Sequence, residues 1–402
     1  MKALRKEDGF SLTELIVTMV VFVIVIAAAS NIFVGILGQF KQQSKIAESN
    51  IEGLIGLQML KTDVEQAGFG LPWNIGTATY AEAVNSGNSI TTWDDTLFND
   101  SSGNPPRPFV FGDGGVIANP PLNGSDVLVV KAANIGTAQA TQRWTYITNI
   151  AATNAVPSYN TTAARWMPDT ANENLANGDR VIAIKPVSGT REREMVLSGG
   201  ANFTIFDVAA YSNNTTIAAG FQPVISSSET HLFYGLGTEN LRMPFNRADF
   251  YVKRPAVMPS QCSADAGTGI LYKATINHAD GERNELPLLD CVREMQVVFA
   301  YDTTSDGDTS PNAWGPLPVA MTVPEMWNQL REVRIYILAH EGSRDNSYTS
   351  SALITATDPN WVGPNPGGAI IYFNAATAGL RNFRWKVFTI VAKPYMQYEV
   401  ER

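Results

Sequence analysis

The first 70 residues carry two different hydrophobic patterns. From Phe10 to Leu37, apolar side chains would occupy every face of a helix, and Glu14 is the only charged residue among them. These 28 residues would span roughly 42 Å as a helix, which exceeds the roughly 30 Å hydrocarbon core of a bilayer. A cleaved secretory signal is disfavoured, because its apolar core is only about 7–15 residues long. The run therefore predicts a transmembrane helix.

The second pattern follows directly after this run. Apolar residues recur at spacings of three or four, which is one face of a helix; they are Ala47, Ile51, Leu54, Leu57, Leu60, Val64 and Ala67. Two glycines at 68 and 70 and Pro72 supply the stop. The two patterns together predict one long helix within 10–70. We expect it to be transmembrane over 10–37 and amphipathic over 38–70, with the amphipathic half packed on the rest of the chain.

Residues 71–402, which we call the head, consist of short β-branched or aromatic segments flanked by Gly, Pro, Asn or Asp. The predicted strands are Val127–Ala132, Trp144–Ile150, Arg180–Lys185, His231–Tyr234, Ile270–Thr275, Gln296–Tyr301, Val333–Ala339, Ala369–Phe373 and Phe383–Val391. A single helical turn is expected at Pro324–Asn328, and two stretches, about 74–124 and 151–178, read as long surface loops. The expected fold class is α+β, with a long N-terminal helix packed on a large antiparallel β-rich head.

Composition narrows the classes of function. Only 17% of the residues are charged and the net charge is −9, so a general nucleic-acid binder, which needs clustered Lys and Arg, is disfavoured. Three histidines are scattered through the head, and the chain contains neither a G-x-S-x-G elbow nor a Gly-Lys dipeptide. We therefore predict that the protein is not an enzyme.

Glu14 requires a partner, because a carboxylate inside an apolar run costs about 2.5–3.5 kcal/mol on insertion scales. Residues 1–9 form a short basic leader, and the segment Gly9-Phe10-Ser11-Leu12-Thr13-Glu14-Leu15 follows it. This segment resembles the prepilin N-terminal signature of type IV pilins and type II secretion pseudopilins. The resemblance implies that a prepilin peptidase cuts between Gly9 and Phe10 and that Phe10 becomes N-methylated. It also implies that Glu14 pairs with the α-amino group of a neighbouring subunit during assembly.

A second resemblance runs through the head. Short segments at Leu60–Gly70, Gly124–Val130, Cys291–Asp302, Leu330–Tyr336 and Arg381–Phe388 are similar, in order and spacing, to those of PilW-like large minor pilins. The resemblance implies a minor pilin in the tip or priming complex of a type IV pilus. Two alternatives stay open at this point: a J-like minor pseudopilin of type II secretion, and a pilus-borne adhesin.

The same resemblance implies the partners and the location. Other pilins would bind through the N-terminal helix, and the prepilin peptidase and the inner-membrane assembly platform would act on the membrane-embedded precursor. The protein would be a single-pass protein of the bacterial inner membrane before assembly. After assembly it would lie at the pilus surface, with its head periplasmic or extracellular.

Two features of the head could carry further chemistry. Cys262 and Cys291 are the only cysteines, and in an oxidising space such a pair tends to form a disulfide. A hairpin between them, turning near 279–281, could bring them together. Asp302, Asp306 and Asp308 could offer oxygen ligands to Ca²⁺, although an acidic surface turn explains the same residues. No other cofactor is expected.

Overall fold

The computed structural model describes residues 11–85, 94–100, 102–117, 121–148, 175–190, 192–206, 219–221, 223, 229–262, 267–304 and 310–395. The chain forms two compact units, Met1–Ile51 and Glu52–Arg402. The long helix α1, Leu12–Glu65, runs through both units. Each unit is described by itself.

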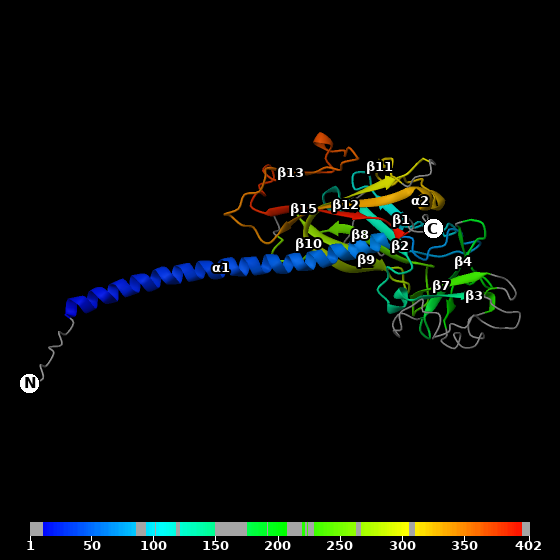
Figure 1. Cartoon of the computed structure of the whole chain (residues 1–402), viewed down its shortest axis with the longest axis horizontal. Helices are drawn as coiled ribbons and strands as arrows, with labels where there is room; N and C mark the ends of the chain where they lie inside the picture. Colours follow the sequence, from blue (N-terminus) through cyan, green and yellow to red (C-terminus); the bar gives the residue numbers. More distant parts are fainter. Residues whose placement is uncertain are drawn as a thin grey trace, which may run out of the picture. The chain divides into compact units, whose positions relative to one another are not determined.

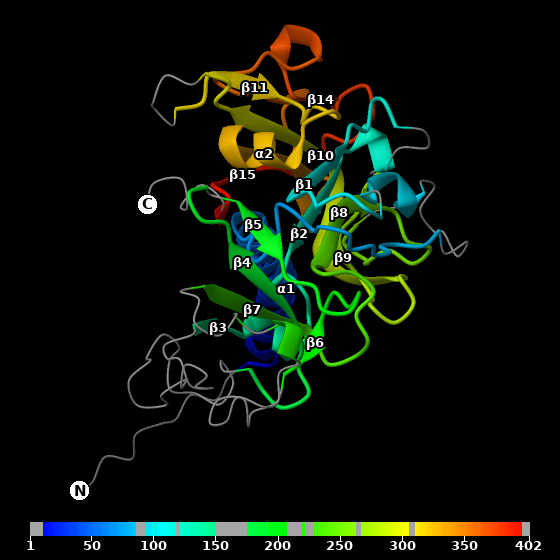
Figure 2. The same ribbon diagram turned by 90° about the vertical axis from the view of Figure 1, so that its right-hand side faces the viewer.

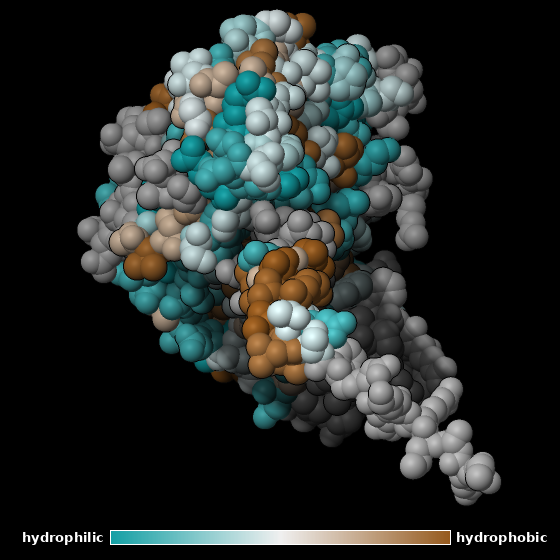
Figure 3. All heavy atoms as spheres, turned by 90° about the vertical axis from the view of Figure 1, so that its left-hand side faces the viewer, coloured by the Kyte–Doolittle hydropathy of each residue, from teal (hydrophilic) through white to brown (hydrophobic). Residues whose placement is uncertain are grey.

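The first part of α1 is apolar on all sides. Its large hydrophobic side chains from Leu12 to Val34 are all exposed, with Phe22 65% accessible, and Figure 3 shows this surface as a continuous apolar area. By length and composition, Leu12–Val34 is long and apolar enough to cross a membrane. An apolar helix is therefore present from Leu12 onward, where a transmembrane helix is predicted, and its crossing of a membrane stays a prediction; Phe10 lies outside the described residues.

The last part of α1 packs into the head. Leu57, Leu60 and Val64 are buried in the main core, as the amphipathic pattern predicts. Leu54, assigned to the same face, is instead 61% exposed. Gly56 faces the sheet at that level, so closely that a Cβ on it would lie 1.9 Å from the carbonyl oxygen of Leu288. The helix thus touches the sheet through backbone as well as through large side chains.

The main sheet is antiparallel throughout and lies along one side of these last turns of α1 (Figure 1). In spatial order its strands are β1 (Phe109–Gly112), β2 (Val127–Ala132), β8 (Asn246–Lys253), β9 (Gly269–Ile276), β10 (Arg283–Tyr301), β12 (Leu330–Glu341) and β15 (Arg384–Ala392), with β11 (Ala313–Gly315) paired to the end of β10. The main core fills the space between α1 and one face of this sheet.

Two smaller sheets complete the head. One contains β3 (Trp144–Thr148), β7 (Thr230–Gly237), β4 (Arg180–Pro186), β5 (Arg193–Met195) and β6 (Thr204–Ile205), and it is separate from the main sheet in Figure 2. The other pairs β13 (Leu353–Ala356) with β14 (Ile371–Asn374). It packs on the second face of the main sheet through a core around Tyr336 and Phe373.

The remaining helices are short. The helix α2, Val323–Gln329, begins with a capping box in which Thr322 and Glu325 bond each other's backbone. Short 3-10 turns are η1 (Asp95–Phe98), η2 (Leu122–Gly124), η3 (Gln139–Gln142), η5 (Ala219–Phe221) and η7 (Pro366–Gly368).

The architecture confirms the predicted fold class, and each predicted strand overlaps an observed one. One central strand, β8, was not predicted from its sequence Asn-Arg-Ala-Asp-Phe-Tyr-Val-Lys. Its charged side chains Arg247 and Asp249 are buried against each other, so its polar positions mimic a loop. Residues 149–174, which include most of one predicted loop, lie outside the described residues.

Candidate functional site

Glu14 lies in the first turn of α1, where Ser11 precedes the helix. The backbone N–H and the hydroxyl of Ser11 both donate to Glu14 Oε2, each at 3.0 Å, while the Glu14 N–H donates to Ser11 Oγ at 3.2 Å. This reciprocal arrangement is a capping box. It satisfies the carboxylate with neutral donors, and no cationic side chain that the structure describes is paired with it.

The surroundings of Glu14 are exposed and apolar. Leu15 and Ile16 next to it are 54% and 53% accessible, and no described part of the chain covers them. An apolar surface of this size is covered in the working state by lipid or by other protein. Any positive partner for Glu14 must come from outside the described side chains. Gly9 and Phe10, the predicted cleavage site, lie outside the described residues.

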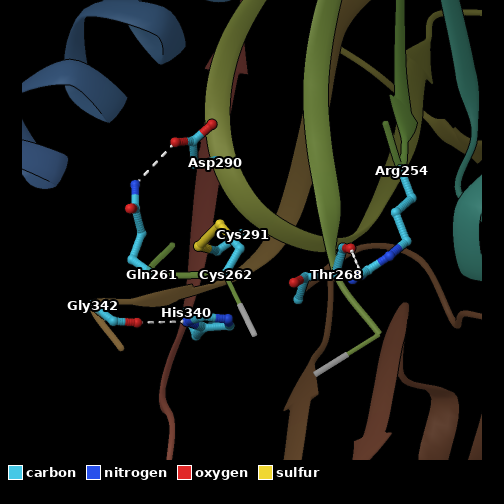
Figure 4. Close-up of a disulfide and its surroundings, with 8 residues drawn as sticks. All are labelled: Arg254, Gln261, Cys262, Thr268, Asp290, Cys291, His340 and Gly342. Atoms are coloured by element: carbon cyan, nitrogen blue, oxygen red, sulfur yellow. Dashed lines mark hydrogen bonds between the residues drawn. A yellow bond between two sulfur atoms is a disulfide. The ribbon is translucent and has the colours of Figure 1, made fainter. Parts of the chain in front are cut away.

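The two cysteines form the predicted disulfide. Cys262 and Cys291 have their sulfurs 2.06 Å apart and their Cα atoms 4.9 Å apart, and both residues are buried. The predicted hairpin is also present: β9 and β10 pair antiparallel, beginning with Ile276 opposite Arg283. Gln261 donates to Asp290 at 3.1 Å beside the disulfide (Figure 4).

The disulfide marks the point where β10 changes partner. Its register with β9 shifts between Leu289 and Val292, and its register with β12 shifts between Val292 and Glu294. Cys291 sits at this irregularity with φ of 57°, a left-handed conformation that non-glycine residues rarely adopt. The bridge therefore ties the 254–262 segment to the bulge at which the two halves of the main sheet join.

The candidate calcium residues are only partly described. Asp302 accepts from Arg331 at 2.9 Å and from the Thr304 N–H at 3.2 Å. Although burial acts to raise it, these bonds hold the pKa of Asp302 below its usual value. Asp306 and Asp308 lie outside the described residues, and the described residues contain no cluster of three His, Cys, Asp or Glu side chains suited to a metal. Calcium binding stays a prediction.

A buried ionic cluster, not predicted from the sequence, lies where residues 79–85 and 94–100 meet β2 and β8. Lys131 Nζ lies 2.7 Å from both Glu82 and Asp100. Arg247 pairs with Glu82 at 3.2 Å and with Asp249 at 2.8 Å. Both cationic side chains are fully buried. No local signal distinguishes them from surface charges, because Glu82, the carboxylate that they share, is distant in sequence.

A polar cavity of about 470 Å³ lies next to this cluster, lined by residues 136–138, 236–239, 246–247 and 275–284 among others. His278 forms part of its wall. Burial lowers the pKa of His278 to about 4, so the ring is neutral, with Nδ1 accepting from the Arg242 N–H at 3.2 Å and Nε2 lying 3.2 Å from Asn246 Oδ1.

Two protein families match the chain. The prokaryotic N-terminal methylation motif matches residues 4–30, and the family Type IV Pilus-assembly protein W (PilW) matches residues 250–392. No curated protein and no solved structure matches. The second match begins inside β8 and ends at the last residue of β15, so it covers β9, β10, β12 and the disulfide.

The apolar helix with its methylation motif and the β-rich head define this protein as a type IV pilin. The match over the second half of the main sheet narrows this class, because it supports a PilW-like type IV pilin. Both matched families are structural or assembly families of pili, and neither is an enzyme family.

Proposed function

We propose that the protein is a minor pilin of the tip or priming complex that initiates assembly of a type IV pilus. The prepilin peptidase removes residues 1–9 between Gly9 and Phe10, and Phe10 becomes N-methylated. The precursor is held in the inner membrane by one span, and the assembly platform then moves it into the filament. The match to a family described as pilus-assembly proteins favours this role over type II secretion.

The observation that carries the proposal is the state of Glu14. Its carboxylate lies on an exposed apolar helix and, among the described residues, receives hydrogen bonds from Ser11 alone. Neutral donors leave the negative charge uncompensated, and a charge in an apolar bundle is tolerated when it is paired. The α-amino group of a neighbouring subunit, freed by cleavage before its Phe10, would provide that pair.

The bulk of the head supports a place at the tip. The sheet of β3, β7, β4, β5 and β6 comes from residues 144–237, which lie outside both family matches. It adds a second layer of structure to a head that already holds the main sheet. A subunit of this size is accommodated most easily where no further head packs above it.

The test compares two glutamates that have the same local role. Glu325 on α2 accepts from the Thr322 N–H at 2.7 Å and from its hydroxyl at 2.8 Å, as Glu14 does from Ser11. Glu14→Ala and Glu325→Ala therefore remove equivalent helix caps, and only Glu14→Ala removes the proposed pair. We expect Glu14→Ala to remain membrane-bound and absent from sheared pili, while Glu325→Ala enters them normally. Equal incorporation of the two variants would contradict the assembly role.

Processing and position are tested separately. Mass spectrometry of the protein from pili should find an N-terminal N-methylphenylalanine, and an N-terminus at Met1 would contradict cleavage. Immunogold labelling of the head should mark filament ends. Labelling along the whole filament would instead indicate a subunit of the regular lattice, and loss of secretion without loss of pili on deletion would indicate a pseudopilin.

A further inference from the structure

The two edges of the main sheet are finished in different ways. At one edge β1 has only four residues, and Phe98 of η1 packs so closely over it that a Cβ on Gly112 would lie 2.8 Å from its ring. At the other edge β15 has nine residues and pairs with β12 over all nine without a register shift. Figure 2 shows β15 at the margin of the main sheet, near the chain end.

The outer side of β15 has backbone groups that no described residue pairs with. Among the described residues, no hydrogen bond joins the main chain of Arg384–Ala392 to anything except β12. In an antiparallel pair, alternate residues point their N–H and C=O groups away from the partner, so four or five of the nine residues aim outward. A long, regular edge with such groups is a template for another strand, and it contains neither a proline nor a bulge to prevent pairing.

The side chains of β15 lie at the margin of two hydrophobic cores, one on each face of the sheet. Ile390 and Ala392 belong to the main core, which Phe388 also contacts, whereas Trp385 and Val387 pack against the second core, around Tyr336 and Phe373. Beyond them Val391 is 45% exposed, and Phe388 and Val387 are only half-buried. A further strand along β15 would cover all three, so the apolar contacts favour the same partner as the backbone.

Charge indicates what kind of strand fits. The two basic side chains of β15 are at its beginning, where Arg384 pairs with Asp345 and Lys386 pairs with Glu341. The remaining six residues, 387–392, carry no charge. A complementary strand is therefore uncharged over its centre and alternates apolar residues toward the two cores.

A second copy of this chain does not fit the edge in a filament. When β15 of one copy pairs antiparallel with β15 of a second copy, the two copies are related by a two-fold axis perpendicular to the sheet. The last turns of α1 lie along a face of that sheet, so such an axis would reverse the direction of one helix. Pairing of Glu14 with the amino end of a neighbour requires the helices to run in the same direction.

We propose that β15 is a docking strand: in the assembled pilus tip, an extended, uncharged segment of a different, neighbouring subunit pairs antiparallel with it and extends the main sheet. This inference rests on the proposed function, because it assigns the surface through which the head of this pilin binds its neighbour. The helix contact through Glu14 and the strand contact through β15 are separate interfaces.

The first experiment places the photo-cross-linker p-benzoylphenylalanine at Val391 of the full chain in piliated cells. The matched control is Val319, which is 90% exposed in the segment before α2. We expect cross-links from position 391 to one other pilus subunit, at least tenfold more abundant than from position 319, with the cross-linked peptide in a segment able to form a strand. Equal yields at both positions, or a cross-link to a second copy of this chain, would overturn the proposal.

The second experiment adds a charge to the edge. Val391→Lys places a lysine where an incoming strand would cover it, and Val319→Lys is the control. We expect Val391→Lys to leave the Tm of the protein within about 2 °C, because an exposed position changes stability little, and to lower its amount in sheared pili at least tenfold. Normal incorporation of Val391→Lys, in cells where Glu14→Ala is excluded from pili, would refute the docking strand and leave the pilin function standing. Normal incorporation of Glu14→Ala would refute the proposed function instead.

Discussion

Replacing Lys131 by methionine tests whether the buried ionic cluster holds residues 79–85 and 94–100 on the main sheet. The ammonium group is fully buried and lies 2.7 Å from carboxylates of Glu82 and Asp100. Methionine has a similar length and no charge, so it fills the space but leaves both carboxylates without this partner. Glu82 keeps Arg247 at 3.2 Å and Asp100 keeps Arg107 at 2.6 Å.

The magnitude follows from the charge balance. The cluster holds four carboxylates, Asp95, Asp249, Glu82 and Asp100, and four cations, Arg283, Arg247, Arg107 and Lys131. Four minus four is zero, and the substitution leaves a net charge of −1 in a buried site. Removing one member of a buried pair costs about 3–5 kcal/mol in the free energy of unfolding. That is a large share of the roughly 5–15 kcal/mol that stabilises a typical domain.

The deficit should depend on pH. Burial acts to raise the pKa of Asp100, but Lys131 and Arg107 hold it below its usual value. Without Lys131 that pKa rises, so the folded variant binds a proton that the folded wild type does not bind. Because the folded variant then takes up protons as the pH falls, its deficit shrinks toward acid, by up to about 1.4 kcal/mol per pH unit for one proton.

The assay is urea unfolding of the full-length protein in detergent, followed by tryptophan fluorescence at pH 8 and pH 5. The matched control is Lys386→Met, which removes an exposed pair with Glu341, where Lys386 is 51% accessible, and which should cost less than about 1 kcal/mol. Equal losses in the two variants would refute the reasoning. A Lys131→Met deficit that is unchanged between pH 8 and pH 5 would refute it as well.

Three further predictions concern the head and the last turns of α1, which pack on it. Replacing Cys262 and Cys291 together by serine should lower the free energy of unfolding by about 2–4 kcal/mol, measured by urea unfolding, and a reductant should then have no further effect. In a helix interior, replacing glycine by alanine normally stabilises the protein by roughly 1 kcal/mol. Gly56→Ala should instead destabilise it, because the added methyl would meet the Leu288 carbonyl oxygen. The pKa of His278 is about 4 in the folded protein, below its unfolded value, so its contribution to stability is present above about pH 6.5 and is lost as the pH falls toward 4. His278→Asn should weaken that acid dependence.

The controls for these variants are also present in the chain. Gly53→Ala places a methyl 2.7 Å from a methyl carbon of the Leu289 side chain rather than against backbone, so it should cost less than Gly56→Ala. Equal losses of stability in Gly53→Ala and Gly56→Ala would show that the close approach of the helix to the sheet backbone does not determine the cost. For His278→Asn, the asparagine oxygen can still accept the Arg242 N–H, and an unchanged slope of stability between pH 6.5 and 4 would contradict the titration of this ring.

Local patterns account for much of what could be predicted. The hairpin of β9 and β10 was expected from two β-rich segments and the turn between them, and with it the Cys262–Cys291 bridge. By contrast, β8 was missed because Arg247 and Asp249 look like loop residues until their partners are known. Helical periodicity puts Leu54 on the buried face of α1, whereas the structure exposes it. Periodicity contains no information that the sheet approaches the helix at Gly56.

The sequence by itself determined the N-terminal helix, its apolar character and the place of Glu14 within it. These properties depend on helical spacing and on the transfer of side chains from water, which act over a few residues. Only the tertiary structure decided which charges are buried in pairs and which strands lie at the two ends of the main sheet. Those outcomes depend on segments more than 100 residues apart in the chain, such as β2 and β8, and a local pattern contains no information about which of them will meet.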